Sequence, residues 1–170
     1  QDMAAEWGID IGIYSMSSYF GDFDNDLDWD ILVSNGADLG NNFLVCDGTP
    51  FLDGTNVLSY NNVAEEAGVL LDNLAWGAMW FDVDNDRWLD LYIATGTSLY
   101  SDYPNVTNFY PNSTNGLFLN PQGVLPLEDV SASINWENEL TFSAAFGDHN
   151  EDGALDFVSH QICLLYTSDA

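Results

Sequence analysis

The stretch "GDFDNDLDWDILVSNG", residues 21–36, places five aspartates within nine positions and follows them directly with an apolar run. The five are Asp22, Asp24, Asp26, Asp28 and Asp30. Carboxylates this close together repel one another unless water or a cation lies between them. The stretch therefore raises the question of what balances its charge.

The same pattern recurs twice, as "WFDVDNDRWLDLYIATG" at residues 80–96 and "FGDHNEDGALDFVSH" at residues 146–160. The first aspartates of the three clusters, Asp22, Asp82 and Asp148, follow one another at intervals of 60 and 66 residues. A second landmark precedes each cluster: "DMAAEWGI" from Asp2, "NVAEEAGV" from Asn62 and "DVSASINW" from Asp129. Landmarks that recur in the same order indicate an internal structural repeat.

Each unit contains short apolar runs bounded by Gly, Asn and Asp, which predict β-strands. The predicted strands are residues 17–20, 31–34, 43–46 and 57–60, then 78–81, 91–94, 117–119 and 127–130. Four strands per unit predict an all-β fold of radial blades. Residues 1–162 would form a partial β-propeller, with about two full four-stranded blades and parts of two more. The segment "VAEEAG", residues 63–68, predicts one helical turn between blades.

The composition sets limits on function. The chain carries 28 acidic residues and one basic residue, Arg87, for a net charge of −27. This charge excludes nucleic-acid binding through a basic patch and argues against docking on anionic membranes. Because 46% of the residues are hydrophobic, we expect a folded core, and the acidity then indicates cation binding or adaptation to salt. No apolar run is long enough to predict membrane insertion.

The aligned clusters predict cation-binding loops at residues 22–30, 82–90 and 148–156. Side chains at positions 1, 3 and 5 would point inward, position 9 would close the shell, and position 7 would contribute a backbone carbonyl. Such hard oxygen ligands suit Ca²⁺, at up to three sites. The side chain of Asp28, at position 7, is predicted to face water. The predicted ligands are Asp22, Asp24, Asp26, Asp30, Asp82, Asp84, Asp86, Asp90, Asp148, Asn150, Asp152 and Asp156.

An EF-hand begins with a similar pattern, but it requires a glutamate at position 12 and helices on both sides. Position 12 is Val33, Ile93 or Ser159 here, and each lies within a predicted strand. The loops are therefore predicted to connect two strands.

The pattern D-x-D-x-D-x-x-x-D, preceded by Phe-Gly and followed by "DILVSNG" or "DLYIATG", resembles the FG-GAP/VCBS repeat. This repeat forms the calcium-loop blade of integrin α-subunit propellers and of many bacterial surface proteins. The segment "NVAEEAGV…WGAMWFDVDNDRWLDLYIATG" is most similar to repeats of ASPIC/UnbV-type proteins, relatives of cartilage acidic protein. The resemblance implies a calcium-stabilised propeller whose remaining blades lie outside this chain.

The sequence departs from the family pattern at position 6, where glycine is usual. Leu27 and Arg87 stand there in the first two loops, and Gly153 in the third. A non-glycine residue with positive φ costs about 1–2 kcal/mol, which predicts weaker binding by the first two loops. In the second repeat, Phe81 replaces the glycine of the Phe-Gly pair.

The sequence leaves three functions open. The first is a non-catalytic extracellular, cell-surface or periplasmic module for adhesion to a protein or carbohydrate ligand. The second is the propeller domain of a secreted polysaccharide-degrading hydrolase or lyase with catalytic residues elsewhere, and the third is an adhesin spacer. The insertion at residues 95–116 is rich in Tyr, Asn and Ser, which suits polar recognition. Its candidate ligand contacts are Tyr100, Tyr103, Phe109 and Tyr110.

Two further features concern packing and the end of the sequence. Tryptophans near the repeat junctions, Trp7, Trp76, Trp80 and Trp136, are predicted to pack between blades, and Cys46 to be a small buried residue. The segment "CLLYTSDA", residues 163–170, matches a reading frame of a transposase sequencing adaptor and is interpreted as non-native read-through. An ordinary strand end is the alternative interpretation.

Overall fold

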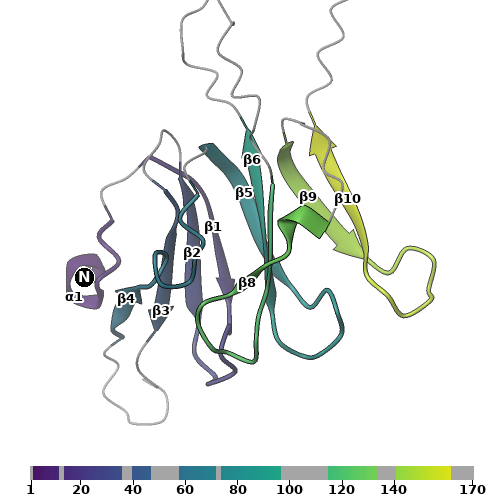
Figure 1. The fold of residues 1–170 in the computed structure, drawn as a ribbon. Coiled ribbons are helices and arrows are strands. Elements are labelled where there is room, and N and C mark those ends of the chain that lie inside the picture. The colour runs from purple at the N-terminus through teal and green to yellow at the C-terminus, as the bar shows by residue number, and fades with distance from the viewer. Residues whose placement is uncertain are drawn as a thin grey trace, which may run out of the picture.

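The computed structural model describes residues 2–11, 14–35, 40–46, 58–71, 74–96, 115–133 and 141–161, which form three antiparallel sheets side by side (Figure 1). The first sheet has the order β1 (Ser15–Gly21), β2 (Asp30–Asn35), β3 (Asn42–Cys46), β4 (Tyr60–Asn62). The second has the order β5 (Leu74–Phe81), β6 (Asp90–Gly96), β7 (Gly116–Leu119), β8 (Glu128–Asp129). The third pairs β9 (Thr141–Gly147) with β10 (Asp156–Gln161). The all-β prediction is confirmed, with two units of four strands.

The fourth strands differ from the prediction. β4 is Tyr60–Asn62, so residues 58 and 59 of the predicted strand 57–60 lie ahead of it, and residue 57 lies outside the described residues. The pairing with β3 sets the register of β4, from Leu44 opposite Asn62 to Cys46 opposite Tyr60. β8 covers only Glu128–Asp129 of the predicted 127–130. The buried side chain of Leu127 contributes to the core from outside the strand. In these two segments, the apolar residues of the sequence therefore predicted buried side chains more accurately than they predicted the ends of the strands.

The helical parts are short. The helix α1 (Ala4–Trp7) precedes the first sheet, and the 3-10 helix η1 (Ser131–Ser133) follows the second. Residues 63–68 form a hydrogen-bonded turn in which the Ala67 amide donates to the Val63 carbonyl at 2.7 Å. No helix in the described ranges is long and apolar enough to cross a membrane.

The first two units repeat in their backbone hydrogen bonds as well as in sequence. Gly8 and Gly68, 60 residues apart, both adopt left-handed φ values, of 79° and 75°. The amide of Ile9 donates to the Ala4 carbonyl at 2.9 Å, and that of Val69 donates to the Ala64 carbonyl at 3.0 Å. The segments that precede the first and second sheets thus have the same backbone turn, as the second sequence landmark predicts.

All three sheets also share one irregularity in their first strands. The pairing register shifts at Met16 in β1, at Trp76 in β5 and at Phe142 in β9, so each of these residues is bypassed. Each lies six residues before the first aspartate of its loop. A β-bulge at one repeat position bends each strand at the same place. The third sheet is therefore equivalent to the first strand pair of the other two.

The core lies between the sheets, where β5 packs against the first sheet and β9 against the second. The ring of Trp80 lies 6.4 Å from Phe23 and 5.3 Å from Phe43 between ring centroids. At the next junction, Phe146 stacks on Phe81 at 3.7 Å. β5 and β9, the first strands of the second and third sheets, thus each pack an aromatic residue against the preceding sheet.

The bypassed residues add a second junction contact, since Trp76 and Phe142 lie 4.9 Å apart. The predicted packing of Trp76 and Trp80 between repeats is confirmed, whereas Trp136 lies outside the described residues. The outer face of the first sheet, around Ile31 and Val33, is partly covered by Ile9 of the N-terminal segment.

Candidate metal centre

The three acidic loops connect the first two strands of each sheet, β1–β2, β5–β6 and β9–β10, and lie at one end of the sheets (Figure 1). Position 12 lies within β2, β6 or β10, as Val33, Ile93 or Ser159. The predicted strand–loop–strand arrangement is confirmed, and an EF-hand is excluded because strands flank each loop.

Position 1 organises each loop through both of its carboxylate oxygens. Asp22 Oδ1 accepts from the amide of Asp26 at 3.0 Å, and Asp22 Oδ2 accepts from that of Leu27 at 3.2 Å. Asp82 and Asp148 accept from the corresponding amides of their loops at 2.8–3.0 Å. A side chain that accepts bonds from its own loop folds the backbone around itself. Position 1 therefore shapes the loop and also presents charge at its centre.

Position 9 closes the loop from the strand side. Oδ2 of Asp30, Asp90 and Asp156 accepts from the position-2 amide at 2.8 Å in all three loops. The other oxygen reaches the third strand or the residue just after it, because Asp30 Oδ1 accepts from Cys46 at 2.9 Å and Asp90 Oδ1 from Asn120 at 2.8 Å. Position 9 thus holds the loop against the body of its sheet.

Two positions in each loop have left-handed backbone. Position 6 has φ of 77° at Leu27, 77° at Arg87 and 87° at Gly153, so the loops keep their shape without the usual glycine. Position 4 is also left-handed, with φ of 58–61°. Sequence reasoning missed position 4, although Asn25 and Asn85 there are residues that tolerate this conformation well.

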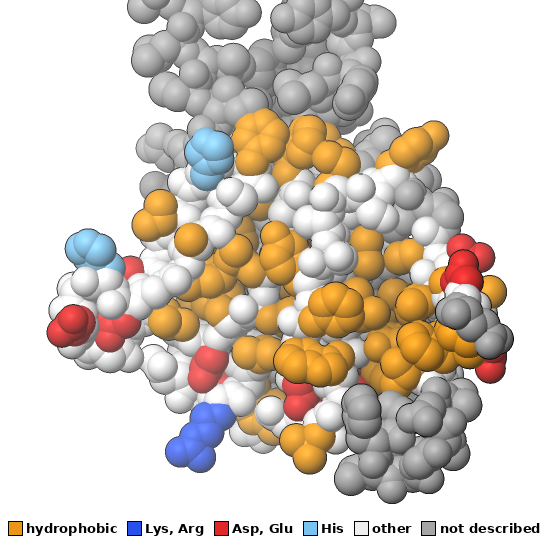
Figure 2. Space-filling model, turned by 180° about the vertical axis from the view of Figure 1, so that it is seen from behind, with side chains coloured by type: hydrophobic (Ala, Val, Ile, Leu, Met, Phe, Trp, Pro, Cys, Tyr) orange, Lys and Arg blue, Asp and Glu red, His pale blue; other side chains and the backbone are white. Residues whose placement is uncertain are grey.

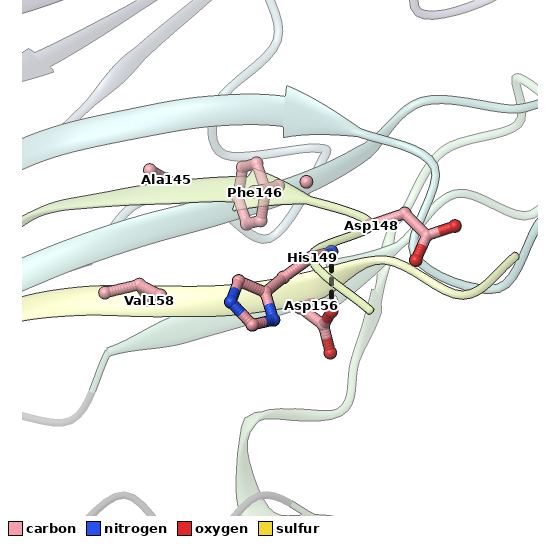
Figure 3. A pocket seen from close by; sticks show the side chains of 7 residues that line it. Ala145, Phe146, Asp148, His149, Asp156 and Val158 are labelled. Carbon is pink, nitrogen blue, oxygen red and sulfur yellow. Dashed lines mark hydrogen bonds between the residues drawn. The ribbon is translucent and has the colours of Figure 1, made fainter. Parts of the chain in front are cut away.

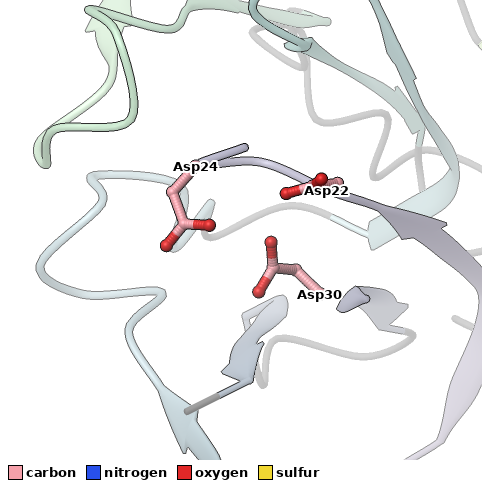
Figure 4. A group of neighbouring side chains, drawn as sticks. All are labelled: Asp22, Asp24 and Asp30. Carbon is pink, nitrogen blue, oxygen red and sulfur yellow. The ribbon is translucent and has the colours of Figure 1, made fainter. Parts of the chain in front are cut away.

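The first loop brings three of its four predicted ligands together (Figure 4). One carboxylate oxygen from each of Asp22, Asp24 and Asp30 lies within 4.8 Å of the others. Asp24 Oδ1 is buried and has no hydrogen-bond partner. The turn after β7 lies against Asp24, since a Cβ on Gly123 would lie 3.0 Å from Asp24 Cα. A buried carboxylate oxygen without a donor is suited to a cation.

Asp28 corrects the sequence prediction, because its side chain is only 7% exposed instead of facing water. It lies beside Cys46 and Tyr60, with a side-chain hydrogen bond to Cys46. Strands β3 and β4 bring these partners to the loop, and their arrival could not be foreseen from the loop pattern. Cys46 is buried as predicted, and burial, followed by the charge of Asp28, raises the pKa of its thiol to about 11.

The second and third loops are more open. Asp82, Asp84 and Asp86 place one oxygen each within 4.8 Å of the others. In the third loop, Asn150 Oδ1 accepts from the Asp152 amide at 2.9 Å, and its amide group donates to Asp152 Oδ2 at 2.9 Å. The third loop keeps the same hydrogen-bond frame with one carboxylate fewer.

Asn120 joins the first two loops, and sequence reasoning did not single it out. Its side-chain amide donates to the Phe23 carbonyl at 2.8 Å and to the Leu89 carbonyl at 3.0 Å. These carbonyls belong to loops of different sheets, so one buried side chain sets their spacing. The sequence signal for Asn120 is the turn motif "NPQG" after an apolar run. This motif predicts a turn but does not reveal that Asn120 binds Phe23, 97 residues away.

Burial opposes ionisation at the base of these loops. It raises the pKa of Asp30 to about 7, despite hydrogen bonds from Phe23 and Cys46, and the charges of Asp24 and Asp28 add to the shift. Burial likewise raises the pKa of Asp90 to about 6, and the pKa of Asp24. A nearby cation would reverse these effects by stabilising the ionised carboxylates.

The predicted ligand contacts Tyr100, Tyr103, Phe109 and Tyr110 lie outside the described residues. The chain matches no protein-family model and no curated protein.

Proposed function

We propose that the chain is a calcium-binding, non-catalytic, extracellular β-propeller module of the FG-GAP/VCBS type that recognises a protein or carbohydrate ligand. The observation that carries this proposal is the hydrogen-bond frame shared by the three loops. In each loop this frame folds the backbone around the position-1 carboxylate. In the first two loops, three carboxylates also place one oxygen each within 4.8 Å of the others.

The donor set favours Ca²⁺ over other common cations. The loops offer carboxylate, amide and backbone oxygens and no thiol, whereas structural zinc sites use cysteine and histidine. The loop geometry is irregular and the ligands are numerous, which suits the flexible coordination of Ca²⁺ better than the strict octahedron of Mg²⁺. The cation would pair with Asp24 Oδ1 and offset the burial of Asp30.

The expected affinity for Ca²⁺ supports an extracellular setting. Non-glycine residues at position 6 and the charge of Arg87 would weaken the first two loops. Extracellular calcium modules work with dissociation constants of about 10⁻⁴–10⁻³ M, so weak loops would still be filled there. The recognition role rests on the sequence resemblance and on the polar insertion at residues 95–116.

The test is a calorimetric Ca²⁺ titration of the whole chain with and without competing Mg²⁺. We expect saturable binding that approaches three ions. Each loop has a matched variant at position 3, namely Asp24→Ala, Asp84→Ala and Asn150→Ala, and each substitution should remove about one ion from the stoichiometry, because alanine has no ligand oxygen. Asp24→Ala is the most informative, because Asp24 Oδ1 is buried without a hydrogen-bond partner.

The control is the double substitution Glu65→Gln and Glu66→Gln, which removes two exposed charges outside the loops. It should leave the stoichiometry unchanged. Absence of saturable binding in a protein whose circular dichroism shows intact β-structure would contradict the proposal. An equal loss of binding in the control would show that Ca²⁺ is attracted non-specifically by the net charge of −27 and is not bound by the loops.

A further inference from the structure

Asn120 connects the position-9 aspartates of the first two loops through a short chain of hydrogen bonds. At one end, Asp30 accepts from the amide of Phe23 at 2.8 Å, and the Phe23 carbonyl accepts from the side chain of Asn120 at 2.8 Å. At the other end, the backbone amide of Asn120 donates to Asp90 at 2.8 Å, and its side chain donates to the Leu89 carbonyl at 3.0 Å. One buried residue therefore links the predicted ligands of two different cations.

The turn that begins at Asn120 also lies between the two loops. The amide of Gly123 donates to Asn120 Oδ1 at 2.7 Å, which holds the turn closed. A Cβ built on Gly123 would lie 2.8 Å from the ring of Trp88 in the second loop and 3.0 Å from Asp24 Cα in the first. Because the turn touches both loops this closely, a shift of one loop would displace the turn and press on the other loop.

In the described part of the chain, such a bridge joins only the first two loops. Cys46 has the place of Asn120 in the first sheet, because its amide also donates to Oδ1 of the position-9 aspartate. Its side chain bonds to Asp28 of its own loop. In the third loop, the amide of His149 donates to Asp156 at 2.8 Å (Figure 3), but among the described residues no hydrogen bond continues from there to the second loop.

We propose that the first two loops bind Ca²⁺ cooperatively and that Asn120 is the residue that couples them. This inference rests on the proposed function, because it concerns the same cations. With a cation bound in the first loop, Asp30 and the Phe23 backbone are held in place, and Asn120 passes this constraint to the second loop. The second cation then meets a loop that is already ordered, so it binds more tightly. By linkage, the second loop strengthens the first by the same factor.

Repulsion between the two cations opposes this coupling. On the face shown in Figure 2, acidic side chains lie in the lower part and at the edges, where solvent and salt reach them. Salt screens interactions between such exposed charges beyond about 8 Å at physiological ionic strength. The hydrogen-bonded path through Asn120 is buried and short, so salt does not weaken it. The net coupling should therefore be positive at physiological ionic strength.

The test is a calorimetric Ca²⁺ titration of the whole chain carrying Asn150→Ala, which removes the third site and leaves the first two. Adding Asp84→Ala leaves only the first loop, and adding Asp24→Ala leaves only the second. Both substitutions keep the Cβ, including the one that lies against Gly123. The overall association constant for two ions should exceed the product of the two single-loop constants by about tenfold, within the usual range of coupling between sites.

The role of Asn120 is tested by Asn120→Ala in the same three backgrounds. This substitution keeps the backbone bond to Asp90 and removes both side-chain bonds, so the excess should disappear. Asn120→Cys, which introduces the residue of the equivalent place in the first sheet, is the milder substitute. Circular dichroism establishes that each variant keeps its sheets.

Asn41→Ala is the matched control. Asn41 is also a buried asparagine, and its side chain joins separate segments by donating to the Val69 carbonyl at 3.1 Å. It precedes β3, at the end of the first sheet away from the loop. Its substitution should lower stability and leave the coupling between the loops unchanged.

Hydrogen exchange provides a readout that does not depend on a second cation. In the variant with Asp84→Ala, Ca²⁺ in the first loop should slow exchange of the Val83 and Arg87 amides, which form the frame of the second loop. The slowing should reach up to about tenfold and should be lost when Asn120→Ala is added.

The outcomes separate this inference from the proposed function. Absence of saturable binding would overturn both. Binding of two ions with an overall constant equal to the product of the single-loop constants would overturn the coupling alone. An excess that persists in Asn120→Ala, or that Asn41→Ala removes equally, would exclude Asn120 as the coupling residue.

Discussion

The Asp30 carboxylate accepts a hydrogen bond from the backbone amide of Cys46 at 2.9 Å, which joins the end of the first loop to β3. Asp30 is fully buried, and its pKa is raised because burial disfavours its charge. A position that shapes the loop is therefore also electrostatically costly when no cation is bound. This coupling between folding and cation binding predicts that stability depends on both pH and Ca²⁺.

Without a divalent cation, stability should fall as the pH rises from about 4 to about 7. Asp30 and Asp90 have folded pKa values of about 7 and about 6, above the ordinary 3.8, so the native state binds more protons than the unfolded state in this window. The free energy of unfolding is highest below pH 4 and decreases through the window, by at most about 4 kcal/mol for Asp30. Urea unfolding at several pH values in the presence of a chelator measures this slope.

Saturating Ca²⁺ should flatten that slope, because the cation stabilises ionised carboxylates. Asp30→Asn is the control for the cation-free slope, since it removes the titrating group and keeps an acceptor oxygen. A variant with an unchanged pH profile would show that the slope comes from general repulsion among the acidic residues.

The substitution Asn150→Asp should strengthen the third loop by about tenfold in Ca²⁺ affinity, because it restores the carboxylate found at position 3 of the other loops. It should also lower stability without the cation, since it replaces the amide that donates to Asp152 with a second negative charge. Titration of Asn150→Asp combined with Asp24→Ala and Asp84→Ala isolates the third loop. Equal affinities with Asn and Asp at position 150 would contradict the predicted role of position 3.

The substitution Leu27→Gly should stabilise the protein by about 0.5–1 kcal/mol. Leu27 has φ of 77° and an exposed side chain, so glycine relieves strain and loses little packing. Relief of about 1–2 kcal/mol exceeds the added entropy of glycine in the unfolded chain. Chemical denaturation provides the measurement. Leu27→Ala, which keeps the strain, should show no gain, and an equal gain in alanine would exclude the backbone explanation.

The substitution Trp80→Ala should cost about 3–5 kcal/mol of stability, the usual range for a large aromatic residue removed from a core. Trp80 packs against Phe23 and Phe43 and fills the space above Gly21, so its loss separates the first two sheets. Thermal or urea unfolding measures the loss. Trp29→Ala, at an exposed tryptophan, is the matched control and should change stability little. Equal losses in both variants would show that the junction is not the main source of stability.

Much of the local structure could be predicted because its signals are local. The loops between strands, the left-handed position 6 and the segments at Gly8 and Gly68 all depend on hydrogen bonds within a few residues. The fourth strands were misplaced because their ends depend on pairing with β3 and β7. The buried side chain of Asp28 was missed for the same kind of reason, since its cover comes from β3 and β4.

The sequence by itself determined the repeat, the all-β character and the residues of the three acidic loops, because short apolar runs and loop hydrogen bonds act over short distances. Only the tertiary structure decided which equivalent positions are buried. Leu32 and Val158 have the same place in their repeats, yet the first is covered by the next sheet and the second is exposed. Burial depends on what packs against a face. Burial also raises the pKa of Asp30 to about 7, whereas in the described part of the chain no atom lies within 4 Å of a Cβ built on Gly147.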